Sequence, residues 1–129
     1  MKNNLKTLGL ILSVAGFNSC TYDNGNMVYP SAIANMDISY MNDIKPIMAT
    51  YCFGLGNQQC HVSNTNQGAL GDFTTYAGLK VKVDNGTLKL RAINPAGGMP
   101  PTYSTGPFPV SDPDKIKIQK WIDAGAPDN

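Results

Sequence analysis

Two of the three cysteines and the only histidine of the chain lie in one stretch, Cys52-Phe-Gly-Leu-Gly-Asn-Gln-Gln-Cys60-His61. A cysteine followed directly by a histidine, with a second cysteine upstream, is typical of covalent haem attachment. In such sites the thiols add to the haem vinyl groups and the imidazole binds the iron. The usual motif is C-x-x-C-H, whereas here seven residues separate the cysteines. The stretch therefore predicts a covalent haem site with an unusually long spacing.

A further candidate iron ligand is Met99, which follows His61 by 38 residues in the segment Asn94-Pro-Ala-Gly-Gly-Met-Pro-Pro101. A helix cannot run through this segment; its glycines permit a close backbone approach, and its prolines stiffen the chain beyond them. The thioether is a soft donor, and His/Met ligation favours reduced haem iron relative to His alone. A methionine more commonly fills a core. Together with the Cys60-His61 pair, however, Met99 is favoured as the sixth ligand.

The insertion between the two cysteines has a composition that allows it to loop out. Gly54, Gly56 and Asn57 all tolerate turn conformations. Closing a few extra residues costs at most about 1 kcal/mol of loop entropy. We therefore expect the insertion to bring Cys60 back beside Cys52.

A helix over residues 42–52 should deliver Cys52 at its end. Apolar side chains at positions 44, 47, 48 and 51 follow the i, i+3, i+4, i+7 spacing of one helix face. Asn42 or Asp43 can cap this helix, and Pro46 is acceptable because it would lie within the first turn.

Three later helices are expected. Thr75 should cap a short helix over residues 76–83 with Tyr76 and Leu79 inward, and a turn at 84–86 precedes another short helix over 88–93. The apolar residues of the second short helix are Leu88, Leu90, Ala92 and Ile93.

The last helix has the clearest boundaries. Ser111 is a cap, Pro113 lies in the first turn, and the helix should end near Ala124, before Gly125. The apolar face of this helix contains Trp121, which we expect to pack against the helix over residues 42–52.

The composition bounds the fold class. At 129 residues the chain has room for one domain with a modest core. Nine prolines and thirteen glycines favour short helices joined by shaped loops, and therefore an all-α fold. A formal net charge of +1 gives no case for nucleic-acid binding.

The first residues predict export. A basic head with Lys2 and Lys6 precedes an apolar run from Leu8 to Phe17, too short to span a bilayer. Cys20 lies just beyond this run, which favours a lipoprotein signal peptide over residues 1–19 and a lipid anchor on Cys20; an ordinary cleaved leader is the alternative. Residues 20–39 then form a flexible tether.

The order of these motifs resembles the small monohaem cytochrome c domains of exported bacterial proteins. The residues that carry the resemblance are Asp43-Ile-Lys-Pro-Ile47, Cys60-His61, Gly98-Met-Pro-Pro101 and Ile118-Gln-Lys-Trp-Ile-Asp-Ala-Gly-Ala-Pro127. The resemblance covers about residues 40–129, which is the whole expected haem domain. It implies a cytochrome c-like fold wrapped around one covalently attached haem c, with the first and last helices crossing.

The same resemblance implies roles for individual residues. Cys52 and Cys60 would form the thioethers, His61 would be the proximal ligand and Met99 the distal one. With both axial positions filled, the centre would pass single electrons between redox protein partners, and the protein would not be an enzyme. The expected location is periplasmic or on the cell surface, as a membrane-anchored lipoprotein of a Gram-negative-type bacterium.

The haem pocket is expected to include Leu79, Leu90, Arg91 and Pro100, although ordinary core packing predicts buried positions for the same leucines. The densest basic cluster is Lys80, Lys82, Lys89 and Arg91. It either orients an acidic redox partner or is a solvated helix face, which is the commoner role of such charges.

Two other interpretations are open from the sequence, and two more are disfavoured. Cys52 and Cys60 could form a disulfide in a haem-free surface lipoprotein used for binding. Structural zinc is disfavoured because it requires four ligands, and two cysteines plus one histidine fall short. A catalytic Cys-His pair is disfavoured because adjacent residues rarely face each other. If Met99 is not a ligand, an open haem site could serve a sensor or a peroxidase, and carbon monoxide binding to the reduced protein would reveal it.

Overall fold

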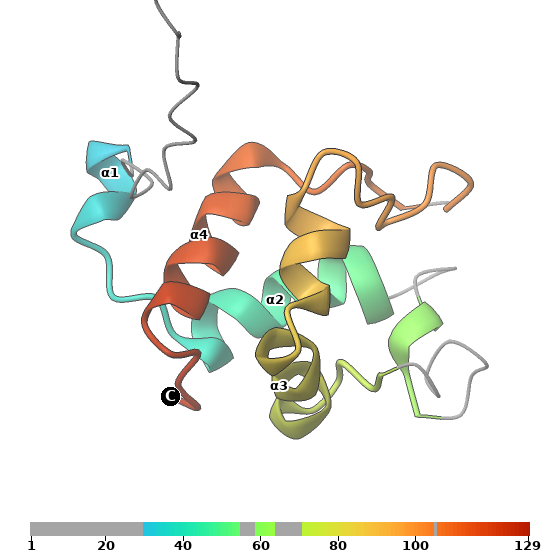
Figure 1. Cartoon of the computed structure of the whole chain (residues 1–129), viewed down its shortest axis with the longest axis horizontal. Coiled ribbons are helices and arrows are strands. Elements are labelled where there is room, and N and C mark those ends of the chain that lie inside the picture. Colours follow the sequence, from blue (N-terminus) through green and yellow to red (C-terminus); the bar gives the residue numbers. More distant parts are fainter. Residues whose placement is uncertain (1–29, 55–58, 64–70, 105) are drawn as a thin grey trace, which may run out of the picture.

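The computed structural model describes residues 30–54, 59–63, 71–104 and 106–129. Every regular element within these ranges is helical, which confirms the predicted all-α class (Figure 1). The elements are α1 (Ser31–Ala34), the π-helix η1 (Tyr40–Ile44), α2 (Lys45–Met48), the π-helix η2 (Ala49–Phe53), the 3-10 helix η3 (Gln59–His61), α3 (Tyr76–Asp84), the π-helix η5 (Lys89–Ile93) and α4 (Asp112–Asp123). The expected signal peptide and Cys20 lie outside the described residues, and none of the helices described is long and apolar enough to cross a bilayer.

The first long helical segment runs through η1, α2 and η2 without a break and is longer than predicted. Its cap is Ser39, whose Oγ accepts from the Asn42 backbone N–H at 3.0 Å, so the predicted cap at Asn42 or Asp43 is wrong. Asp43 instead lies in the first turn and accepts from the Ser39 N–H at 3.0 Å. At the helix start the Ser39 side chain thus satisfies the Asn42 amide, and the Asp43 side chain satisfies the Ser39 amide.

The earlier start also changes the place of Pro46, which lies inside the segment and not in its first turn. Proline has no N–H and cannot continue an i→i−4 ladder. The segment accommodates it by a change of register, because the Lys45 N–H donates to the Tyr40 carbonyl five residues back before α-helical bonding resumes in α2.

The boundaries of α4 are as predicted. Ser111 Oγ accepts from the Asp114 N–H, and the chain leaves the helix at Gly125 with φ of +90°. The Gly125 N–H donates to Ile122 O and the Ala126 N–H to Trp121 O, both at 2.9 Å, which together form a Schellman motif. The helix end is fixed further because the Trp121 indole N–H donates to Pro127 O at 3.0 Å.

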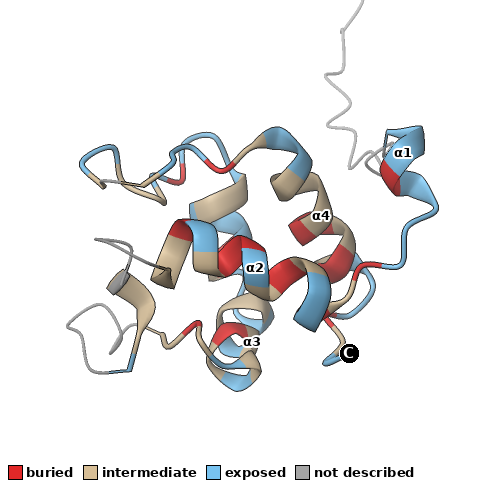
Figure 2. Cartoon of the chain, turned by 180° about the vertical axis from the view of Figure 1, so that it is seen from behind, coloured by how far each residue is buried: buried red, intermediate tan, exposed pale blue. Residues whose placement is uncertain are grey.

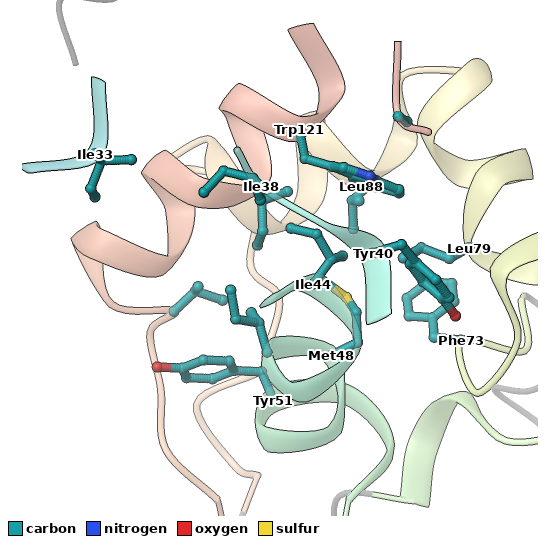
Figure 3. Close-up of a cluster of buried hydrophobic side chains, with 14 residues drawn as sticks. Ile33, Ile38, Tyr40, Ile44, Met48, Tyr51, Phe73, Leu79, Leu88 and Trp121 are labelled. Atoms are coloured by element: carbon teal, nitrogen blue, oxygen red, sulfur yellow. The ribbon is translucent and has the colours of Figure 1, made fainter. Parts of the chain in front are cut away.

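The core lies between the first long segment and α4, with α3 and η5 closing it (Figure 2). Trp121 and Ile44 have no exposed surface, and the rings of Trp121 and Tyr40 stack with centroids 6.0 Å apart (Figure 3). The prediction that Trp121 packs against the first long helix is therefore confirmed. We call η1, α2, η2 and α4 the helical scaffold.

Residues 30–39 belong to the folded structure, so the expected tether extends too far along the chain. Ile33 and Ile38 are buried. The Lys120 ammonium of α4 donates to the carbonyls of Ile33 at 2.8 Å and Ala34 at 2.7 Å, and also to that of Met36. A cation at the carbonyl end of a short helix satisfies groups that would otherwise need water. Only two isoleucines of this segment, Ile33 and Ile38, are buried, so its sequence shows no apolar period.

The two shorter helices also follow the predicted pattern, with one exception. Thr75 caps α3 by accepting from the Gly78 N–H at 3.1 Å, and Gly86 makes the following turn with φ of +74°. Leu79 and Leu88 are buried as expected. Leu90 is 60% exposed, so it contributes little to the packing of the described core.

Candidate functional site

Cys52 lies near the end of η2, as predicted, and its side chain packs against the core. Its Sγ lies 3.9 Å from the Sδ of buried Met48, to which the thiol donates. Burial raises the pKa of the Cys52 thiol to about 12, and the nearby Cys60 adds to this rise. The thiol is therefore protonated at neutral pH.

Cys60 and His61 lie on η3, which contacts η2. Residues 55–58 of the insertion are outside the described residues, but the two described ends bring Cys60 close enough to affect the ionisation of Cys52. No disulfide joins the two cysteines. The structure thus brings the two cysteines together despite the long spacing between them.

The His61 imidazole is oriented by two contacts. Its Nδ1 lies 3.2 Å from Gly71 O, and its ring stacks on Phe73 with centroids 4.2 Å apart and planes at 4°. The Phe73 N–H also donates to His61 O at 2.9 Å. Phe73 is itself part of the core beside Leu79 and Tyr40 (Figure 3), so the imidazole is stacked against the folded body of the protein.

Gly71, whose carbonyl contacts the imidazole, can lie against Phe73 and Lys82 because it lacks a side chain. Its φ is +146°, and a Cβ there would lie 2.8 Å from the Phe73 ring and 2.9 Å from the Lys82 stem. A carbonyl can only accept, so the Gly71 bond places the proton on Nδ1 and leaves the lone pair on Nε2.

The electrostatic surroundings keep this imidazole neutral. Partial burial lowers the pKa of His61; the Gly71 hydrogen bond opposes the effect, and the charge on Lys82 adds to it. A neutral histidine that donates from one ring nitrogen to a backbone carbonyl is the usual arrangement of an imidazole ligand to a metal. The donor set at His61 therefore fits the axial position of a haem iron.

Met99 lies in the segment after η5 and is half-buried. Its backbone N–H donates to Arg91 O at 3.0 Å, which ties the segment to the end of η5. This segment and η3 lie at the same side of the molecule in Figures 1 and 2. We call residues 59–63, 71–73 and 94–104 the ligand side. No hydrogen bond or ring contact in the described part of the chain joins Met99 to His61.

The expected pocket residues occupy different environments. Leu79 is completely buried in the core, whereas Leu90 and Arg91 are exposed and Pro100 is half-buried. Leu90 lines a hollow of about 500 Å³ that includes neither cysteine and neither expected axial ligand; its lining is Gly86, Lys89, Leu90, Ile93, Asn94 and Pro95. The described structure therefore does not gather these residues around His61.

The basic cluster is only partly unopposed. Lys80 pairs with Asp84 one helical turn away, and this contact raises the pKa of the lysine. Lys89 and Arg91 are exposed. Lys80 therefore lies on a solvated face of α3, as is common for surface charges.

Gly71 and Phe73 are two site residues that the sequence did not predict, because residues 62–72 have the composition of a polar loop. The available signal is one aromatic residue, Phe73, two residues before the Thr75 cap. The contact with His61 is non-local, however, and no periodicity reports it.

Comparison of the chain with family models, with curated proteins and with solved structures finds no match. In the described ranges no group of three or more His, Cys, Asp or Glu side chains could hold a metal ion. A haem iron held by one histidine and one methionine does not require such a group.

Proposed function

We propose that the chain is an electron-transfer protein, a membrane-tethered monohaem c-type cytochrome that passes single electrons between redox protein partners. The observation that supports it best is the His61 imidazole, whose Nδ1 is held by Gly71 O while Nε2 keeps its lone pair. This prepared ligand directly follows Cys60, and the fold brings Cys52 close to Cys60. Bound haem c would supply an iron centre that accepts and returns one electron.

Each thiol has a defined part in the attachment. The Cys52 and Cys60 sulfurs would each bond to one carbon of a vinyl group, and each thiol hydrogen would go to the other carbon. The addition has no leaving group and consumes no oxidant. Cys52 enters as the protonated thiol, which is the form that the structure stabilises.

The arrangement of helices is compatible with the proposed cytochrome c-like fold, in which the first and last helices cross at the haem. Contacts between α4 and η1 join the two ends of the domain, and Lys117 Nζ of α4 lies 3.5 Å from Asp43 Oδ1. Met99 would be the distal ligand. The lipid on Cys20 would anchor the protein in the periplasm or on the cell surface.

A second candidate function is favoured by the closeness of the same two thiols. In an oxidising compartment Cys52 and Cys60 could form a disulfide, and the protein would then be a haem-free surface lipoprotein. This alternative gives no role to the oriented imidazole.

The deciding experiment is a pyridine haemochrome spectrum of the full-length protein matured in a host that attaches haem. We expect one haem with both vinyl groups saturated, one unsaturated vinyl in Cys52→Ser, and the same in Cys60→Ser. The reduced wild-type protein should also resist carbon monoxide if Met99 fills the sixth position. A colourless protein with Cys52 bonded to Cys60 would reject the proposal.

A further inference from the structure

The segment that carries Met99 folds back onto the end of η5 at one point of very close contact. Gly97 is the only buried residue of the run 94–99. A Cβ on Gly97 would lie 2.3 Å from Arg91 O and 2.4 Å from Leu90 O. These are backbone atoms and cannot rotate away, so even one methyl group at this position requires the two segments to separate.

The close contact at Gly97 allows the hydrogen bond at Met99. The carbonyls at the end of a helix lack intrahelical partners, and the Met99 N–H satisfies one of them by donating to Arg91 O at 3.0 Å. Within the segment, the Gly97 N–H donates to Asn94 O at 2.8 Å and the Ala96 N–H to Asn94 Oδ1 at 2.9 Å. Gly97 is thus needed for the space it leaves beside η5, because it is the contact at this residue that brings Met99 to Arg91.

We propose that Gly97 is a positioning residue for the distal ligand: its missing side chain lets the backbone at Met99 be held against the end of η5, and the thioether would bind the haem iron from there. This inference rests on the proposed function and concerns the same site. A side chain at position 97 would lift the segment, break the Met99–Arg91 bond and withdraw the sulfur, while Cys52, Cys60 and His61 would remain in place.

The test is Gly97→Ala in the full-length, haem-loaded protein. We expect an unchanged haem content and pyridine haemochrome spectrum, a lower reduction potential, and carbon monoxide binding to the reduced form. The apparent affinity for carbon monoxide scales with the fraction of molecules whose iron is open, so it should rise about tenfold or more over wild type. Met99→Leu gives the limit of complete opening.

The matched control is Gly125→Ala. Gly125 has φ of +90°, a Cβ there would meet nothing within 4 Å, and the residue ends α4 far along the chain from Met99. Its replacement should lower stability and leave carbon monoxide binding and the potential as in wild type. A merely structural role of Gly97 would give the same result as this control.

If Gly97→Ala does not fold, Asn94→Ala tests the same segment, because it removes only the exposed Ala96–Asn94 hydrogen bond. It should increase carbon monoxide binding to a smaller extent. The inference is overturned if the variant that folds retains wild-type potential and wild-type resistance to carbon monoxide. A wild-type protein that holds no haem, or that binds carbon monoxide itself, overturns the proposed function instead.

Discussion

In the helical scaffold, side chains of one segment hold those of another, whereas on the ligand side His61 and Met99 each make a hydrogen bond to a backbone carbonyl. Tyr51 Oη of η2 donates to Asp114 Oδ2 at 2.9 Å, and Tyr40 stacks on Trp121. The His61 imidazole instead donates to a carbonyl, and the Met99 segment is fixed by its amide.

This difference between the two regions suggests that the scaffold determines the stability of the fold and the ligand side determines the position of the candidate ligands. Buried rings and aliphatic side chains supply most of the free energy of folding, since each fully buried large apolar side chain contributes about 1.5–3 kcal/mol. Two glycines, Gly71 and Gly97, let the ligand side pack closely against neighbouring segments, because a side chain at either position would collide with them. Changes in the scaffold should therefore lower stability, and changes on the ligand side should alter ligation.

The largest effect is expected from Trp121→Ala. Removing this completely buried ring should lower the free energy of unfolding by about 3–5 kcal/mol. Urea denaturation of the full-length protein measures the loss, and the haem spectrum of the folded fraction should not change. Ile122→Ala, at a half-buried neighbouring position, is the control and should cost less. A changed spectrum in Trp121→Ala would contradict the separation of the two regions.

A smaller effect is expected at Cys52, where the scaffold meets the ligand side. Its pKa of about 12 lies far above the ordinary value of 9.0, so the thiolate fraction at pH 8 falls about a thousandfold. A thiolate of higher pKa is more nucleophilic, so alkylation of haem-free protein should slow by only about tenfold to a hundredfold.

Mass spectrometry of the labelled Cys52 peptide measures this rate, and the same protein in urea gives the reference. Equal rates in the folded and unfolded protein would show that the Cys52 sulfur is not enclosed by Met48 and the core.

The smallest effect is the pH dependence from His61. Folding lowers the pKa of this imidazole below 6.5, so the unfolded chain binds the proton more tightly. The contribution of the neutral His61 imidazole to the free energy of unfolding is complete above about pH 6.5, and it is lost as the pH falls through the folded-state pKa. Urea titrations of haem-free protein across this range should show the loss, and His61→Gln should lack it. An identical profile in the variant would place the titration elsewhere.

The parts of the structure that the sequence predicted are those with local signals. Ser111 and Gly125 mark both ends of α4 because caps act within a few residues. Ser39 is also a cap, but a helix start predicted from Ile44 misses Tyr40, which continues the same apolar face four residues earlier and is buried. The change of register around Pro46 is not visible in a simple period either.

The rest of the site depends on contacts between distant segments. Gly71 and Phe73 hold His61 across a stretch with no periodicity, and Gly97 contacts carbonyls that only the folded η5 presents. Residue type identifies Cys52, Cys60, His61 and Met99 as candidates. Residue type alone cannot show which neutral backbone groups orient them.

The Lys120 contacts with residues 33–36 limit how far the domain can stand from a bilayer. Lys120 of α4 holds the carbonyls of Ile33 and Ala34, in a helical turn that begins at Pro30. Under the proposed lipidation of Cys20, residues 21–29 would therefore link the lipid to the folded domain. The ten Cα-to-Cα steps from Cys20 to Pro30 extend to at most roughly 35 Å, half the reach of a tether ending at residue 40. Under the proposed function, redox partners would therefore have to reach this domain at the membrane surface.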